Sequence, residues 1–288
     1  MPRARSWIRS IRLVETLFLQ AFPVLGLLYA GRERILAHPL ASAWLLVCLC
    51  LLYAHVFALN DWANIEEDVG HPTKASATFL GYGISRQSMR NLAVALGLAA
   101  LGGVAFLSAR TWPYALGLLA AGTLYSHPRL AWKRVPLASS ALHLVSGTAH
   151  FLVGRALLRP LDAGSLALGS WCGLIFAAGH LIQEVEDHDA DRRFGVSTNA
   201  VRFGKRRVFV AAFLAFTLSF VLLACLAGTG ILPSRLWVLV LLYPPLALLL
   251  LQALRRGLGP ADVARTRRCY RILFAVLVIA LGAGLWGA

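Results

Sequence analysis

The chain has 288 residues, of which 58% are hydrophobic and only 14% are charged, and its formal net charge is +15 at pH 7. A soluble domain is usually close to half apolar, with about a quarter of its residues charged, so this composition excludes a water-soluble globular protein. The positive charge does not indicate nucleic acid as a partner, because no basic stripe interleaved with aromatic residues accompanies it.

Nine apolar stretches are candidates to cross a bilayer, which takes about 20 mainly apolar residues in a helix. The first follows a basic segment, but it is too long for the apolar core of a signal peptide, and we expect it to be retained. Short connections separate the stretches, so we expect one transmembrane domain over residues 1–288. Pro244 and Pro245 predict a kink in the eighth stretch. The stretches are 13–31, 41–59, 91–109, 112–126, 138–158, 166–183, 208–230, 234–253 and 270–287.

The lysines and arginines predict which side of the membrane each connection occupies. With a cytoplasmic N-terminus and nine spans, most of the 28 basic residues fall in cytoplasmic connections, as the positive-inside rule requires. The net positive charge then reflects these cytoplasmic connections. It would attract anionic lipid headgroups, so we expect membrane lipid to be a partner. We therefore expect an integral protein of the plasma (inner) membrane, with the N-terminus facing the cytoplasm.

Nine of the 13 acidic residues lie in two short segments, 60–68 and 184–191, each at the predicted cytoplasmic end of an apolar stretch. Carboxylates are costly at a membrane edge, and clustering them adds repulsion unless a cation intervenes. The alternative is that they are solvated loop acids that offset the arginine-rich connections. Two clusters at matching depth, each with helical spacing, favour a cation site over that alternative.

Helical spacing places oxygen donors of each cluster on one face. Asn60, Asn64 and Asp68 recur at i, i+4 and i+8, with Asp61 beside them. In the second cluster, the acids at positions 184, 187 and 191 recur at i, i+3 and i+7. Two such faces pointing at each other would form the ring of oxygen ligands that Mg²⁺ prefers, completed by water and substrate phosphate. The predicted ligands of Mg²⁺ are Asn60, Asn64, Asp68, Glu184, Asp187 and Asp191.

These residues carry a resemblance to a known family, the UbiA superfamily of intramembrane prenyltransferases. The family motif NDxxDxxxD is matched from Asn60 to Asp68, with Asn64 in place of the middle acid. The motif DxEDxxxD is matched from Glu184 to Asp191, with glutamate in its first position. Residues 125–134 are similar to the family's YSxP…LK loop. The chain departs from the family at 74–78, where Arg-Pro-Leu is absent, and at 139–140, where two serines replace Leu-Asp.

The resemblance implies an all-α membrane protein with about nine transmembrane helices around a central cavity that opens toward the cytoplasmic side. It also implies Mg²⁺-dependent transfer of a prenyl group from a prenyl diphosphate to an unidentified small acceptor, aromatic or lipid-like. The catalytic residues would be Asp61, Asp68, Asp187 and Asp191. The substrate-binding residues would be Asn60, Asn64, Lys74, Tyr125, Arg129, Lys133 and Glu184.

Three other functions remain open on the sequence alone. A membrane terpene cyclase would ionise the same donor without an acceptor. A phosphoribosyl-transferring relative is suggested by the segment 71–74 (His-Pro-Thr-Lys). A cation transporter is disfavoured, since transporters usually carry their acids near the membrane midplane. Among other side chains, His180 lies one turn before Glu184 on the same face and is a candidate to line the pocket, although a lone histidine is usually structural. Trp62 and Tyr125 are candidates to stabilise an allylic cation.

Overall fold

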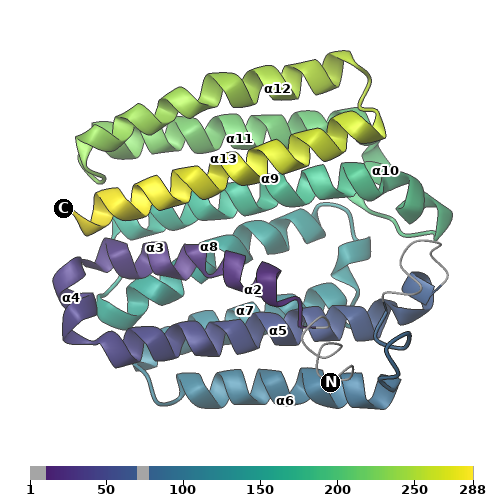
Figure 1. Ribbon diagram of the computed structural model, residues 1–288, viewed down its shortest axis with the longest axis horizontal. Coiled ribbons are helices and arrows are strands. Elements are labelled where there is room, and N and C mark those ends of the chain that lie inside the picture. The colour runs from purple at the N-terminus through teal and green to yellow at the C-terminus, as the bar shows by residue number, and fades with distance from the viewer. Residues whose placement is uncertain (1–10, 70–77, 288) are drawn as a thin grey trace.

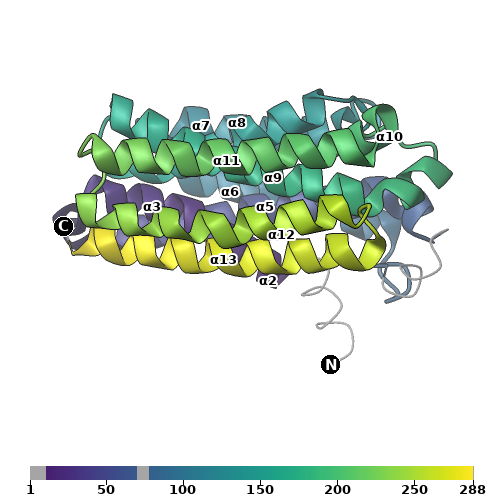
Figure 2. The ribbon, with the colours of Figure 1, turned by 90° about the horizontal axis from the view of Figure 1, so that it is seen from above.

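The computed structural model describes residues 11–69 and 78–287, and every regular element in these ranges is a helix. The long helices run side by side along the longest axis of the molecule (Figure 1). Seen from above, α12 and α13 lie on one side, and α7 and α8 lie on the other (Figure 2). The elements are α2 (Leu13–Leu19), α3 (Ala21–Ala30), α4 (Arg32–Ala37), α5 (Pro39–Val69), α6 (Arg86–Val104), η2 (Ala109–Thr111), α7 (Trp112–Ser126), η3 (Trp132–Arg134), α8 (Ala138–Leu158), α9 (Ala163–Arg193), α10 (Asn199–Phe203), α11 (Lys205–Gly228), η4 (Ser234–Leu242), α12 (Tyr243–Arg255) and α13 (Pro260–Trp286).

Seven helical segments of the described chain are long and apolar enough to cross a membrane. Two further helices, α6 and α7, coincide with the third and fourth predicted stretches but do not meet that standard. The helix α7 has only 15 residues, and α6 begins with the polar sequence from Arg86 to Asn91. Both pack in the bundle against α5. The seven segments are Leu13–Ala30, Pro39–Val69, Ala138–Leu158, Ala163–Arg193, Lys205–Gly228, Ser234–Arg255 and Pro260–Trp286.

Prolines explain the two places where a predicted span is not one continuous α-helix. Pro23 has no N–H, and its ring crowds the carbonyl four residues earlier at Leu19, so α2 ends there and α3 starts after Gln20. Pro244 and Pro245 act in the same way in the eighth stretch. That segment runs as a 3₁₀ helix to Leu242 and continues as α12.

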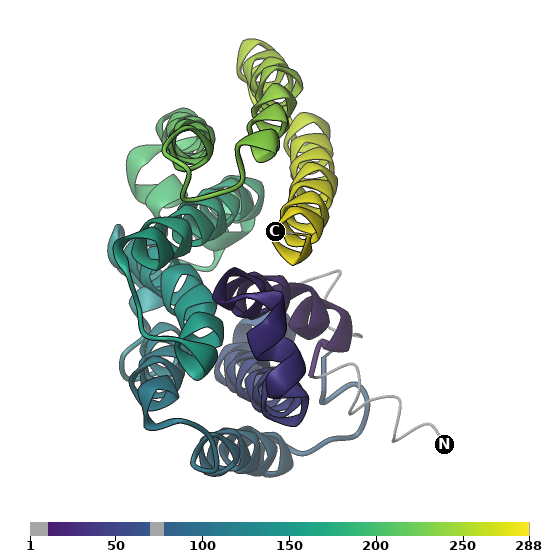
Figure 3. The ribbon, with the colours of Figure 1, turned by 90° about the vertical axis from the view of Figure 1, so that its left-hand side faces the viewer.

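Glycines allow three central helices to approach closely, which is the usual basis of helix packing in lipid. A Cβ added at Gly26 of α3 would meet the carbonyl oxygen of Phe151 in α8 at 2.1 Å, and one at Gly154 of α8 would meet that of Pro23 at 2.2 Å. In α9, a Cβ at Gly173 would meet a carbonyl oxygen of α8 at 2.4 Å. The helix α8 is therefore held between α3 and α9, and an end-on view shows α3 next to α13 (Figure 3).

The two acid-bearing helices extend beyond their apolar parts. The helix α5 runs ten residues past the predicted end of its apolar stretch at 59, and α9 runs ten residues past the predicted end of its own at 183. Both acidic segments are therefore helical, as their spacing predicts. Their C-terminal ends lie at the same end of the bundle, the right-hand end in Figure 1. The fold thus brings 60–68 and 184–191 to one side of the molecule.

Candidate active site

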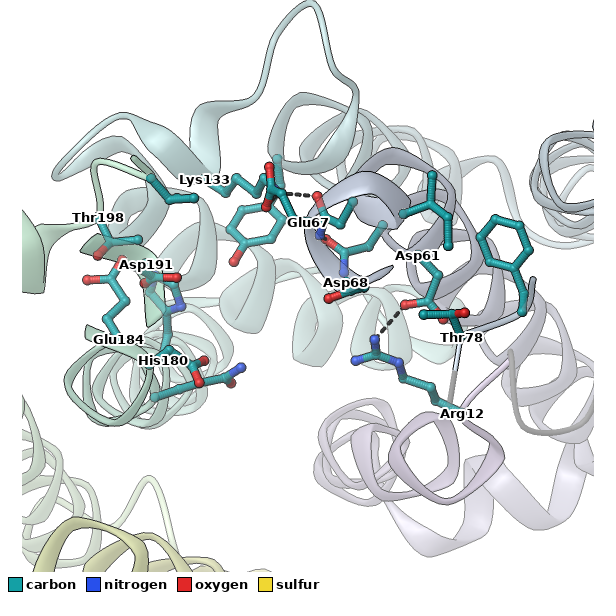
Figure 4. Close-up of a pocket in the computed structure, with 18 of the residues that line it drawn as sticks. Arg12, Asp61, Glu67, Asp68, Thr78, Lys133, His180, Glu184, Asp191 and Thr198 are labelled. Carbon is teal, nitrogen blue, oxygen red and sulfur yellow. Dashed lines mark hydrogen bonds and ion pairs between the residues drawn. The ribbon is translucent and has the colours of Figure 1, made fainter. Parts of the chain in front are cut away.

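A polar cavity of about 500 Å³ separates the ends of α5 and α9. Figure 4 shows Asp61 and Asp68 on one wall and Glu184 and Asp191 on the opposite wall. Most of the residues predicted from the sequence line this one cavity, which is the central expectation of the motif pattern. They are Asn60, Asp61, Asn64, Asp68, Tyr125, Lys133, Glu184, Asp187 and Asp191.

Two predicted residues are not placed in the cavity. Lys74 lies outside the described residues, as does the segment 71–74 that suggested a phosphoribosyl-transferring relative. Arg129 is exposed in the loop after α7, where its backbone N–H donates to His127 Nδ1 at 3.3 Å. Its guanidinium is not among the groups that line the polar cavity.

On the α5 wall, two amides and a lysine form one group. Asn64 Nδ2 donates to Asn60 Oδ1 at 3.1 Å, and the Lys133 ammonium donates to Asn64 Oδ1. Lys133 Nζ also lies 3.7 Å from Glu67. Burial lowers the pKa of Lys133 from its usual value, and the charge of Glu67 raises it in part. The ammonium of a loop residue is therefore held at the cavity wall beside the donors of α5.

The remaining acids of the α5 end bind arginines, and one of them, Glu67, also lines the polar cavity. Glu66 pairs with Arg86 at 2.9 Å, and Glu67 pairs with Arg134. Trp62 is not among the residues that line the polar cavity, and the Arg86 guanidinium lies 5.7 Å from its ring centre. The expectation that Trp62 could stabilise a cation in the pocket is therefore not met.

Arg12 reaches the α5 wall from the start of α2. Its Nη2 lies 2.5 Å from Asp61 Oδ1, an ion pair that is drawn dashed in Figure 4. The contact joins residues 49 positions apart, so no local pattern in the sequence indicates it. Arg12 adds a second cation to the rim of the cavity.

On the α9 wall, Glu184 is the most deeply buried acid of the cluster, with 4% of its surface exposed. Its Oε1 accepts hydrogen bonds from Ser139 Oγ and Asn199 Nδ2, both at 3.1 Å, and lies 3.0 Å from His180 Nε2. Asn199 Oδ1 accepts a hydrogen bond from the backbone N–H of Leu137 at 2.6 Å. This network ties α8, α9 and α10 together behind the cavity.

The remaining acids of α9 divide between the cavity and the outside. Asp187 and Asp191 are half-buried and line the cavity. Glu186 faces α13, where Arg267 Nη1 lies 2.6 Å from its carboxylate. Asp189 pairs with Lys205 at 2.8 Å. Helical phase thus separates cavity-facing carboxylates from carboxylates that bind neighbouring helices.

A second, apolar cavity of about 830 Å³ adjoins the polar one. The two share Arg12, Asn60, Tyr125, His180 and Gln183. The apolar cavity extends between α2, α3, α5, α7, α8, α9 and α13 as far as Gly282. His180, one of the candidates from the sequence, lines both cavities. The site therefore has a charged chamber that continues into an apolar one.

The donor atoms of the polar cavity fit a hard divalent cation. They are carboxylate and amide oxygens, which Mg²⁺ prefers, and Mg²⁺ usually keeps several waters and takes only one or two carboxylates. Within residues 11–69 and 78–287, no three histidine, cysteine or carboxylate side chains lie close enough together to hold a metal by themselves. A metal here would bind across the cavity, with water or a ligand completing its shell.

Several lining residues were not identified from the sequence, among them Thr78, Gln183 and Thr198. Thr198 lies seven residues after Asp191, where the second motif ends, and is followed by Asn199. Gln183 precedes Glu184 by one residue and carried no signal of its own.

Comparisons with known proteins agree with this architecture. The model described as the UbiA prenyltransferase family matches residues 21–278. A search of curated proteins finds no match.

Solved structures with the same fold cover nearly the whole chain. A digeranylgeranylglyceryl phosphate synthase has a TM-score of 0.77 at 15% identity, with 100% of both chains covered. A UbiA homologue from Archaeoglobus fulgidus bound to GPP and Mg²⁺ has a TM-score of 0.70 at 14% identity, covering 98% of this chain and 100% of that one. A UbiA homologue from Aeropyrum pernix K1 has a TM-score of 0.72 at 19% identity, covering 95% and 97%. At these identities the likeness establishes the fold.

Proposed function

Because this chain belongs to the UbiA prenyltransferase family, we propose that it transfers a prenyl group from a prenyl diphosphate to an acceptor inside the membrane. One observation carries the proposal: the ends of α5 and α9 line a polar cavity that continues into an apolar one. A prenyl diphosphate has the same division, with a charged head and an apolar tail.

The diphosphate binds in the polar cavity together with Mg²⁺. Relatives from Archaeoglobus fulgidus that bind GPP or DMAPP together with Mg²⁺ support this assignment. The residues that would hold the metal face the cavity from both walls. Glu184 instead supports the site from behind, because its Oε1 is engaged by Ser139 and Asn199 and its Oε2 is buried. The proposed ligands are Asn60, Asn64, Asp68, Asp187 and Asp191.

Bound Mg²⁺ would stabilise the charge that develops on the leaving diphosphate. Lys133, held at the α5 wall, is placed to bind a phosphate oxygen and add to that stabilisation. Tyr125 and His180 line the junction of the two cavities, where the allylic carbon of the donor would lie. The ring face of Tyr125 would stabilise positive charge on that carbon by about 0.5–2 kcal/mol.

The reaction exchanges one bond of the donor for one bond to the acceptor. The allylic carbon–oxygen bond breaks, and its electron pair leaves with the diphosphate. An electron pair of the acceptor forms the new bond to carbon, and the acceptor loses a proton. The apolar cavity would exclude water from the allylic carbon during this exchange, which limits hydrolysis of the donor.

The tail of the donor lies in the apolar cavity, beside α2, α3 and α13. Leu17 and Phe18 of α2 and Ile279 of α13 line this cavity and are also exposed at the surface of the bundle. In a bilayer that surface contacts lipid, so a tail longer than the cavity could extend between α2 and α13.

The proposal includes the number of membrane crossings and the side of the membrane on which the cavity opens. We propose that α6 and α7 also cross the membrane, which gives nine crossings, and that the polar cavity opens toward the cytoplasm. The end of the bundle that bears the cavity also bears Arg192, Arg193, Lys205, Arg255 and Arg256 at helix ends. The positive-inside rule supports a cytoplasmic position for this end, and we propose the plasma membrane as the location of the protein.

The test is a turnover assay in membranes with labelled prenyl diphosphates of several lengths, with and without candidate acceptors. We expect release of diphosphate that requires Mg²⁺, disappears with EDTA and yields a prenylated acceptor. A cyclic hydrocarbon or alcohol formed from the donor alone would instead identify a terpene cyclase. No Mg²⁺-dependent release from a donor of any length would contradict the proposed function.

A further inference from the structure

The apolar cavity reaches the surface of the bundle between α2 and α13. Glu15 and Phe18 of α2 and Arg271 of α13 line this cavity and are also exposed. The Arg271 guanidinium lies 5.8 Å from the centre of the Phe18 ring, so the two helices face each other here. Seen end-on, α13 lies beside the N-terminal helices (Figure 3). This place, defined by Glu15, Phe18 and Arg271, is called the side opening below.

The side opening carries one acid and one base that are not paired with other side chains. Arg267, one turn before Arg271 on α13, pairs with Glu186 of α9 at 2.6 Å. Glu15 and Arg271, by contrast, have no ion-pair partner among residues 11–69 and 78–287. Phe18 follows Glu15 by three residues and so shares its face of the helix. The negative charge of Glu15 and the positive charge of Arg271 therefore flank the same opening.

Both charges belong to segments that are long and apolar enough to span a membrane. Glu15 lies in Leu13–Ala30, and Arg271 lies in Pro260–Trp286. Ionisable side chains in such segments are costly unless they are paired, and they are usually functional. The long arginine side chain can extend toward the headgroups, whereas the shorter glutamate cannot reach as far. The two side chains thus require partners of opposite charge next to an apolar surface: an anion for Arg271 and a cation for Glu15.

From this charge pattern we propose that the side opening binds the headgroup of one phospholipid, phosphatidylethanolamine. The phosphate accepts hydrogen bonds from the Arg271 guanidinium, and the primary ammonium donates to the Glu15 carboxylate. An acyl chain of the lipid lies along Leu17 and Ile279, which line the cavity and are exposed. The inference goes beyond the proposed function and does not depend on it, because it concerns the lipid-facing surface. A donor tail that extends between α2 and α13 would pass beside this lipid.

Charge complementarity favours this headgroup over two other common ones. Phosphatidylglycerol has the phosphate but no cation, so it would leave Glu15 unpaired and place a second negative charge near it. Phosphatidylcholine has both charges, but its quaternary nitrogen carries no hydrogen that could be donated to the carboxylate. Hydrogen bonds between charged groups are about twice as strong as those between neutral groups. Of these three headgroups, ethanolamine alone supplies a hydrogen-bonding partner for both side chains.

The test compares headgroups on identical acyl chains. The full-length protein in mild detergent is titrated with phospholipids that carry ethanolamine, choline or glycerol, and native mass spectrometry counts the bound lipids. We expect the ethanolamine lipid to bind roughly three- to tenfold more tightly than the choline lipid, as one or two partly exposed ion pairs would supply. The N-methyl and N,N-dimethyl ethanolamine lipids give a second measurement that needs no variant. Both keep an N–H, so the preference should persist through the dimethyl lipid and fall at choline.

Variants then assign that preference to the side opening. Arg271→Gln should weaken binding of both the ethanolamine and the glycerol lipid, because both carry the phosphate. Glu15→Gln should weaken binding of the ethanolamine lipid alone, because the glycerol lipid has no ammonium. The matched controls are Arg268→Gln in α13 and Glu33→Gln in α4. Both of these side chains are exposed and are not among the residues that line the apolar cavity, so we expect neither control to change the preference.

The outcomes separate this inference from the proposed function. Equal binding of the ethanolamine and choline lipids would overturn it, as would tighter binding of the glycerol lipid. A preference that survives both Arg271→Gln and Glu15→Gln, or that Arg268→Gln also abolishes, would place the lipid elsewhere and overturn it too. Mg²⁺-dependent diphosphate release from farnesyl diphosphate is measured separately on the wild-type protein. Its absence would overturn the proposed function and leave the lipid site standing.

Discussion

The two acid-bearing helix ends, 60–68 of α5 and 184–191 of α9, are held in place in different ways. The α5 end is bound largely by cations from other segments: Arg12 contacts Asp61, and Lys133 and Arg134 contact Glu67. These pairs are partly exposed. On α9 the innermost acid, Glu184, is buried and is held by neutral donors from α8 and α10.

This difference bears on how the site forms. Exposed ion pairs contribute little, about 0–1 kcal/mol each, so the α5 wall can exchange its partners when a diphosphate and metal bind. A buried hydrogen-bond network is costly to disturb, so the α9 wall is set before any ligand arrives. We therefore regard α9 as the fixed wall and α5 as the adaptable one.

The largest effect should come from removing a cavity-facing carboxylate from either wall. We expect Asp68→Ala and Asp187→Ala each to lower turnover by about 100-fold or more, because each removes a ligand from the charge-stabilising site. Initial rates of diphosphate release in membranes measure this. Glu186→Ala is the matched control, since its carboxylate faces Arg267 outside the cavity. Near-normal rates in both aspartate variants would refute the shared site.

The next effect separates the walls by stability. Glu184→Ala should lower the free energy of unfolding by about 1–3 kcal/mol, because it leaves the buried Asn199 amide and Ser139 hydroxyl without their acceptor. Glu67→Ala on the α5 wall should cost at most about 1 kcal/mol. Unfolding of the purified variants in detergent compares the two. Equal losses would remove the distinction between a fixed and an adaptable wall.

A smaller effect is expected at Lys133. Its ammonium lies at the α5 wall, where burial lowers its pKa and Glu67 partly restores it. Lys133→Ala should raise the KM for the prenyl diphosphate about tenfold, the loss of roughly 1.4 kcal/mol that one hydrogen bond to a charged group supplies. Lys133→Arg should retain part of this affinity. An unchanged KM in the alanine variant would assign Lys133 to packing of the loop.

The smallest effect tests the outer surface of the α5 end. Arg86→Ala breaks the ion pair with Glu66, whose side chains are 48% and 81% exposed. We expect a change in unfolding free energy within about 0.5 kcal/mol and no change in turnover. A marked loss of turnover would mean that the outer acids of α5 take part in the reaction.

The sequence was sufficient to predict that the acidic ends of α5 and α9 line one cavity from opposite sides. In a chain with 13 acidic residues, clustered acids are conspicuous, and helical spacing assigns them to faces. The same spacing made His180 a candidate to line the pocket, and this residue lines both cavities. The extension of α5 and α9 beyond their apolar parts followed from that spacing as well, since a helical face requires a continuous helix.

The features that the sequence could not supply are long-range or depend on backbone breaks. The pairing of Arg12 with Asp61 and the bonds of Asn199 join segments that are far apart in the chain, so no local pattern encodes them. Trp62 has a favourable position in the motif, but it packs beside Arg86 because its face of the helix turns away from the cavity. Hydropathy predicted nine spans, whereas α6 and α7 are too polar or too short to be identified as such by length and composition.

The central claim is that α5 and α9 bind one metal–diphosphate group between them. The most direct test is a structure of the full-length protein with Mn²⁺ and an unreactive prenyl thiodiphosphate, with the metal located by its anomalous signal. We predict metal peaks in the polar cavity, bridging the diphosphate to Asp68 on one side and to Asp187 or Asp191 on the other. Metal bound by one helix alone, or a diphosphate bound outside this cavity, would contradict the account.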